Sequence, residues 1–170
     1  PAWTNKDWLK MKYGRDNCAR DPYCRQLKRI WEEGGASEEA IRKNILAADK
    51  SLTFEQVEQN AARYEGTPWA FECKIFDIVA HEKRSTGEYI LAEVIVEDDP
   101  ERRIAVKGDF STGFVENDYV YVVGYFTGTS HPRFGPRNPR SRNLKVVGMA
   151  ARAMLKPGEA REILNSSRTN

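Results

Sequence analysis

The chain has 170 residues, of which 40% are hydrophobic and 31% are charged, and its formal net charge at pH 7 is +2. This composition is typical of a globular protein with one sizeable core, and it excludes an intrinsically disordered chain. No apolar stretch reaches the length of about 20 residues that a membrane-spanning helix requires, so no membrane span is predicted.

Residues 1–66 are predicted to form a helical extension, because capping residues and glycines mark its helices. The predicted starts and stops are Thr4 with Asp7 and Gly14, Asp21-Pro22 and Gly34-Gly35, Ser37 with Glu38 and Glu39, and the capping box Thr53 and Gln56 with Gly66. Five aromatic residues are expected to pack these helices on each other or on the next domain, namely Trp3, Trp8, Trp31, Phe54 and Tyr64. The alternative is an aromatic face that binds a peptide or a base.

From residue 67 the hydrophobic period changes from helical to strand-like, which predicts an α+β protein. Five strands are expected, over residues 69–79, 89–96, 103–106, 119–127 and 144–154. The first shifts phase near Phe76, as a bulged and strongly bent strand does. Turns are predicted at 81–87 and 98–100, a connector at 111–117, and a C-terminal tail with one helical turn at 157–170.

A basic loop at residues 129–145 lies before the fifth strand. It contains no acid, and its candidate binding residues are Arg133, Phe134, Arg137, Arg140 and Arg142. Residues 120–170 carry nine bases against two acids, whereas residues 72–119 carry twelve acids against six bases. The loop is therefore a candidate site for an anion or a nucleic acid. The alternatives are a solvated loop and a loop that pairs with the acidic strands.

Residues 115–124, Val-Glu-Asn-Asp-Tyr-Val-Tyr-Val-Val-Gly, are an acidic turn followed by an alternating strand. Together with the strand pattern, this segment resembles tRNA-anticodon-binding-like OB-fold domains, and the resemblance covers residues 67–156. It implies a five-stranded Greek-key barrel that binds ligands on the face of strands two and three, between the loops 82–86 and 129–145. The strand residues that it implies for this face are Tyr89, Arg103 and Lys107.

The resulting hypothesis is a non-catalytic module that binds single-stranded nucleic acid. Aromatic rings stack on bases, and arginines pair with phosphates or stack on bases as well. Acids such as Glu88 and Glu93 lie nearby in the sequence and would repel phosphate. The N-terminal helices would then serve as a docking arm or as a surface for homo-oligomerisation.

Cys18 and Cys24 flank a short polar loop that contains Asp21-Pro22. They are interpreted as a disulfide, with two unpaired thiols as the alternative. A disulfide would indicate an extracytoplasmic or periplasmic protein, whereas free thiols would indicate a cytoplasmic one. The alternative function is therefore an envelope module that binds a protein or a polymer. The chain begins at Pro1 rather than Met, which is expected either of a mature form that has lost a signal peptide or lipid-anchored leader or of a trimmed chain.

No catalytic or cofactor motif is present, so the sequence predicts neither an enzyme nor a cofactor. Asp109, Asp118 and Arg103 are residue types that OB-fold nucleases use, but their spacing matches no catalytic pattern. No second pair of Cys or His residues completes a ligand set with Cys18 and Cys24, and no metal site is predicted. Cys73 lies in an apolar strand and is expected to be a buried thiol.

Overall fold

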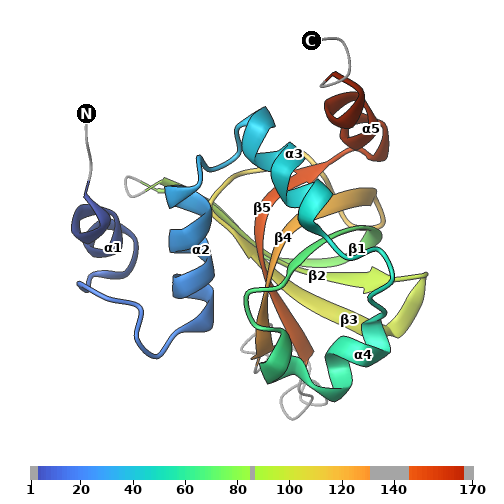
Figure 1. The fold of residues 1–170 in the computed structure, drawn as a ribbon, viewed down its shortest axis with the longest axis horizontal. Coiled ribbons are helices and arrows are strands. Elements are labelled where there is room, and N and C mark those ends of the chain that lie inside the picture. Colours follow the sequence, from blue (N-terminus) through green and yellow to red (C-terminus); the bar gives the residue numbers. More distant parts are fainter. Residues whose placement is uncertain (1–3, 85–86, 131–145, 167–170) are drawn as a thin grey trace.

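The computed structural model describes residues 4–84, 87–130 and 146–166 (Figure 1). Its helices are α1 (Asn5–Tyr13), α2 (Pro22–Glu32), α3 (Glu38–Ala47), α4 (Phe54–Gln59), the 3-10 helix η1 (Ala61–Tyr64) and α5 (Pro157–Ser166). Its strands are β1 (Pro68–Arg84), β2 (Gly87–Val96), β3 (Asp99–Gly108), β4 (Tyr119–Ser130) and β5 (Val146–Leu155). The predicted α+β class, with a helical extension before a five-stranded barrel, is confirmed.

Within the described residues, the strands close into a barrel in the order β1-β2-β3-β5-β4. Neighbouring strands are antiparallel except β3 and β5, which run parallel from the pair Ile104–Val147 to the pair Gly108–Ala151. Side chains alternate between the interior and the outer face of the barrel. The inward side chains form one buried cluster, which Phe54 of α4 also joins.

Strand β1 bends because its first half pairs with β4 and its second half with β2. The register slips between Ile75 and Asp77, so the bulge predicted near Phe76 is confirmed. The charged turn predicted at 81–87 is wrong, because β1 continues to Arg84 and pairs with β2 over most of this segment. The backbone ladder of the long hairpin outweighs the low strand propensity of its charged residues.

The turn between β2 and β3 lies one residue earlier than the predicted turn at 98–100. Glu97 and Asp98 both have a φ of 55°, as the two central residues of a type I′ hairpin turn do. Strand β3 therefore begins at Asp99 and includes Pro100. The register shifts here, and a proline is tolerated at such an irregularity because no ladder hydrogen bond is required from it.

The predicted helix starts are confirmed by side-chain caps. The capping side chains of α1 to α4 are Thr4, Asp21, Ser37 and Thr53, each of which accepts a hydrogen bond from the first turn. A single helix up to Gly66 is wrong, because Asn60 has a non-helical φ of −138° and separates α4 from η1. Among the described segments, no helix has the length and apolar character needed to cross a membrane.

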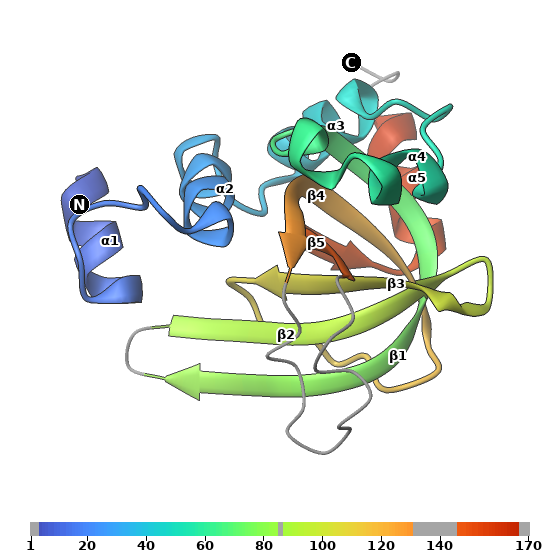
Figure 2. The same cartoon turned by 90° about the horizontal axis from the view of Figure 1, so that it is seen from below.

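Helices α1, α2, α3 and α5 cover the outer face of β4 and β5, and Figure 2 shows them on one side of the barrel. Tyr125 and Ala150 pack with α1 and α2, whereas Val123 and Ala153 pack with α3 and α5. The outer face of β1, β2 and β3 lies largely outside these clusters. The barrel therefore has one face covered by helices and a second face on which β1 to β3 carry the predicted site residues.

A disulfide joins Cys18 and Cys24, with their Cα atoms 5.2 Å apart, as predicted. Cys18 precedes α2, and Cys24 lies in its first turn. The bond therefore holds the α1–α2 connection against the start of α2. Cys73 is a buried thiol, as expected, and burial raises its pKa.

Candidate functional site

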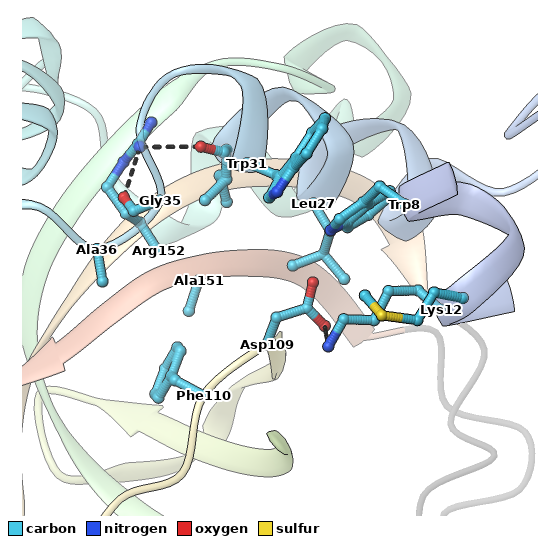
Figure 3. Close-up of a pocket in the computed structure, with 12 residues that line it drawn as sticks. Trp8, Lys12, Leu27, Trp31, Gly35, Ala36, Asp109, Phe110, Ala151 and Arg152 are labelled. Atoms are coloured by element: carbon cyan, nitrogen blue, oxygen red, sulfur yellow. Dashed lines mark hydrogen bonds and ion pairs between the residues drawn. The ribbon is translucent and has the colours of Figure 1, made fainter. Parts of the chain in front are cut away.

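A cleft of about 250 Å³ lies where α1 and α2 meet the barrel (Figure 3). Its lining comes from α1, from α2 and the turn that follows it, from the connector after β3, and from β5. These segments are far apart in the sequence, because one wall contains Trp8 and another contains Ala151. The cleft is thus a product of the docking of the helical extension on the barrel.

The helical wall of the cleft is mostly apolar. Trp8 and Met11 of α1, and Leu27, Ile30 and Trp31 of α2, are spaced so that each set lies on one face of its helix. The rings of Trp8 and Trp31 stack, with centroids 5.8 Å apart and planes inclined by 25°. Both tryptophans therefore pack as expected and also line a cavity.

The barrel wall is formed by small groups and one aromatic ring. The ring of Phe110 folds back over Gly108, where an added Cβ would lie 2.3 Å from the ring atom Cε1. Ala151 of β5 contributes only a methyl group. Because Gly108 has no side chain, Phe110 closes against the end of β3 and forms part of the cleft.

Two opposite charges stand at this apolar cleft. The Nζ of Lys12 lies 3.8 Å from Oδ1 of Asp109, and their side chains are 14% and 25% exposed. Burial raises the pKa of the Asp109 carboxyl, and the charges of Lys12 and Lys107 only partly oppose this effect. Because the distance of 3.8 Å to Lys12 is longer than a hydrogen bond, the carboxylate of Asp109 is able to accept hydrogen bonds from a ligand.

Arg152 closes the back of the cleft and is only 3% exposed. Its guanidinium donates to Asn44 Oδ1, to the backbone oxygens of Ile30 and Gly35, to the Glu33 carboxylate and to the Tyr125 hydroxyl. Two of these bonds are visible in Figure 3. Arg152 therefore joins β5 to α2, α3 and β4, and its donors are already used by the protein. In the sequence, Arg152 is a lone arginine in an alanine-rich strand, and this pattern did not predict its buried network.

The structure places Tyr89, Arg103 and Lys107 on the outer face of β2 and β3. Leu91 pairs with Lys107 across the two strands, and Ile95 pairs with Arg103, so these residues share one side of the sheet. Both cations have intramolecular partners there. The Nζ of Lys107 lies 5.4 Å from the ring centroid of Tyr13 in α1.

An arginine and an exposed aromatic ring stack on the same face. The guanidinium of Arg103 lies 4.3 Å from the ring centroid of Phe76, which is 40% exposed at the bulge of β1. Arg103 also lies 3.6 Å from the carboxylate of Glu93, whose pKa is raised by burial although Arg103 opposes that shift. Phe76 was not among the predicted site residues, although the break in strand alternation near Phe76 marked an unusual position in the sequence.

The basic-loop residues lie outside the described residues; they are Arg133, Phe134, Arg137, Arg140 and Arg142. Asp109 and Asp118, the carboxylates that were considered as nuclease residues, interact with different partners. Asp109 faces Lys12 in the cleft, and the carboxylate of Asp118 accepts the backbone N–H of Val115 at 2.9 Å. In the described part of the chain, no three His, Cys, Asp or Glu residues gather as metal ligands would.

No protein-family model matches this chain, and neither a curated protein nor a solved structure matches it.

Proposed function

We propose that this chain is a non-catalytic, extracytoplasmic binding module whose ligand site is the cleft between α1, α2 and the barrel. The cleft carries the proposal, because it combines aromatic and aliphatic walls with two converging charged groups. A small number of polar groups in a mostly apolar, preformed cavity is the usual composition of a ligand site.

The disulfide supports both the compartment and the preformed site. Disulfides persist in oxidising compartments and are rare in the cytosol. The Cys18–Cys24 bond ties the connection that follows α1 to the first turn of α2, and both helices provide one wall of the cleft. A covalent restraint at this point reduces the entropy lost when a ligand orders the helices.

A cleft-filling substitution tests the proposed site. Ala36 is exposed at the edge of the cleft, and Ala36→Phe places a ring in it. Benzyl alcohol and p-cresol are suitable neutral probes, detected by saturation-transfer NMR on the oxidised protein. We expect the affinity of the variant for both probes to fall about tenfold or more, because apolar area of the cleft is no longer available to them.

Ala62→Phe is the matched control, since Ala62 is exposed on η1 and does not line the cleft. The control is expected to bind both probes as the unsubstituted chain does. Reduction of Cys18–Cys24 is expected to weaken binding by loosening α2. The proposed site would be wrong if the probes fail to bind, or if Ala36→Phe and Ala62→Phe bind them equally well.

A second candidate function is the binding of single-stranded nucleic acid by an OB-type barrel. The strand order, with its parallel β3–β5 pair, supports an OB assignment. The stack of Arg103 on the exposed ring of Phe76 favours this function, because bases add to such platforms. Glu93 opposes it, because its carboxylate lies beside Arg103 on this face and would repel phosphate.

Fluorescence polarisation with a labelled single-stranded oligonucleotide tests the second candidate. Phe76→Ala is expected to weaken binding by about 1–3 kcal/mol through the loss of one stacked base. Leu46→Ala, which removes an apolar side chain that is 70% exposed on α3, is the control and is expected to have no effect. Absence of binding at low salt, or binding insensitive to both salt and Phe76→Ala, would exclude this function for the β1–β3 face.

A further inference from the structure

We infer that the cleft binds a free amino acid with an apolar side chain, whose ammonium group faces Asp109 and whose carboxylate faces Lys12. This inference rests on the proposed function, because it assigns a ligand class to the same cleft. The apolar side chain would occupy the space between the two tryptophans and Phe110.

The two charged groups at the cleft have unused hydrogen-bonding capacity. The Lys12 Nζ to Asp109 Oδ1 distance of 3.8 Å exceeds that of a hydrogen bond. An ammonium has three donors, and a carboxylate accepts on both oxygens. Figure 3 shows both side chains side by side at the same end of the cleft. An α-amino acid carries its own ammonium and carboxylate on one carbon, so it presents the opposite charge to each group.

The arrangement excludes Arg152 as the group that holds the carboxylate. Its N–H donors already bind protein oxygens on α2, α3 and β4, and the side chain is nearly inaccessible. Among the described residues that line the cleft, Lys12 is therefore the cation that is available to a ligand. Lys107 adds a positive field at Asp109, which opposes the effect of burial on the pKa of this carboxyl.

The cavity volume limits the ligand to a small molecule. A volume of about 250 Å³ lies just below the range of roughly 300–1,000 Å³ that is typical of sites for drug-sized ligands. The stacked rings of Trp8 and Trp31 and the ring of Phe110 provide a surface for an aromatic or branched aliphatic side chain. A single apolar amino acid fits both the volume and this lining.

Isothermal titration calorimetry with four probes tests the assignment on the oxidised chain of 170 residues. L-phenylalanine is compared with phenethylamine, which lacks the carboxylate, with 3-phenylpropionate, which lacks the ammonium, and with neutral benzyl alcohol. We expect L-phenylalanine to bind about tenfold or more tightly than each of the others, since each charged contact in a desolvated site contributes that much.

Two single substitutions separate the roles of the charges. Asp109→Asn is expected to weaken L-phenylalanine and phenethylamine but not 3-phenylpropionate, whereas Lys12→Met is expected to weaken L-phenylalanine and 3-phenylpropionate but not phenethylamine. Lys10→Met, at an exposed position of α1, is the control and should leave all four affinities unchanged. Circular dichroism establishes whether each variant folds. If a variant does not fold, the comparison of the four probes on the unsubstituted chain still tests the assignment.

The outcomes distinguish the two proposals. If benzyl alcohol binds as tightly as L-phenylalanine and Ala36→Phe weakens both, the ligand class is wrong while the cleft remains the binding site. If 3-phenylpropionate or phenethylamine binds as tightly as L-phenylalanine, the assignment of a zwitterionic ligand is wrong, while the cleft remains the binding site. If no probe binds, both the ligand class and the proposed function are wrong.

Discussion

Replacement of Arg152 by Met is expected to lower the free energy of unfolding by about 3–5 kcal/mol, which is the cost of removing one partner from a buried charged network. The substitution leaves Asn44 Oδ1 and the backbone oxygen of Gly35 without the donor that they share, whereas the oxygen of Ile30 still accepts the N–H of Gly35. An unpaired buried polar group costs the full price of its desolvation. Urea denaturation followed by circular dichroism measures the change.

The network around Arg152 also holds Glu33 in its ionised form. Although burial acts to raise the pKa of Glu33, hydrogen bonds from Tyr125 and Arg152 lower it below its ordinary value. Arg152→Lys retains the charge but not the planar set of donors, so it is expected to lose a large part of the same stability.

Arg161→Met is the matched control for Arg152→Met. Arg161 is exposed on α5, and surface substitutions of this kind usually change stability by less than about 0.5 kcal/mol. The assigned role of Arg152 would be contradicted if Arg152→Met and Arg161→Met unfold at the same urea concentration.

Gly124→Ala is expected to destabilise the barrel by about 3 kcal/mol or more, at the upper end of the cost of overpacking. A Cβ at position 124 would lie 2.0 Å from the backbone oxygen of Ala150 and 2.9 Å from the Cα of Ala151. Both atoms belong to the main chain of β5, which cannot rotate away as a side chain would. Differential scanning calorimetry is expected to show a melting temperature lowered by about 2–4 °C for each kcal/mol lost.

Gly113→Ala provides the comparison for Gly124→Ala. A Cβ added at Gly113 meets no described atom within 4 Å. The same chemical change is therefore expected to be nearly neutral at Gly113, within about 0.5 kcal/mol. Equal melting temperatures for the two variants would show that β4 and β5 do not approach each other as closely as the structure places them.

Most elements of the fold followed from local signals. Thr4, Asp21, Ser37 and Thr53 cap the four helices that the sequence predicted, because a capping hydrogen bond spans only two or three residues. The bulge at Phe76 was visible as a break in alternation. The disulfide was also predictable, since a six-residue separation with Asp21-Pro22 between the cysteines brings its ends together.

The errors lie where pairing with a distant segment overrides local preference. Residues 81–84 read as a turn but belong to β1, because β2 supplies hydrogen-bond partners for them. The turn assigned to residues 98–100 lies at Glu97 and Asp98, because the β2–β3 register determines where the chain reverses. Periodicity within one segment contains no information about such partners.

The sequence by itself determined the α+β class, the order of the helices and strands, the caps and the cysteine pair, because each of these depends on residues close together in the chain. Only the tertiary structure decided the cleft, where Lys12 of α1 meets Asp109 after β3, and where Trp31 of α2 and Phe110 line the same cavity. It also decided the role of Arg152, whose partners on α2, α3 and β4 are more than 25 residues away along the chain. Contacts of this kind depend on how the helical extension docks on the barrel, and docking is set by the fit of whole surfaces rather than by any local pattern.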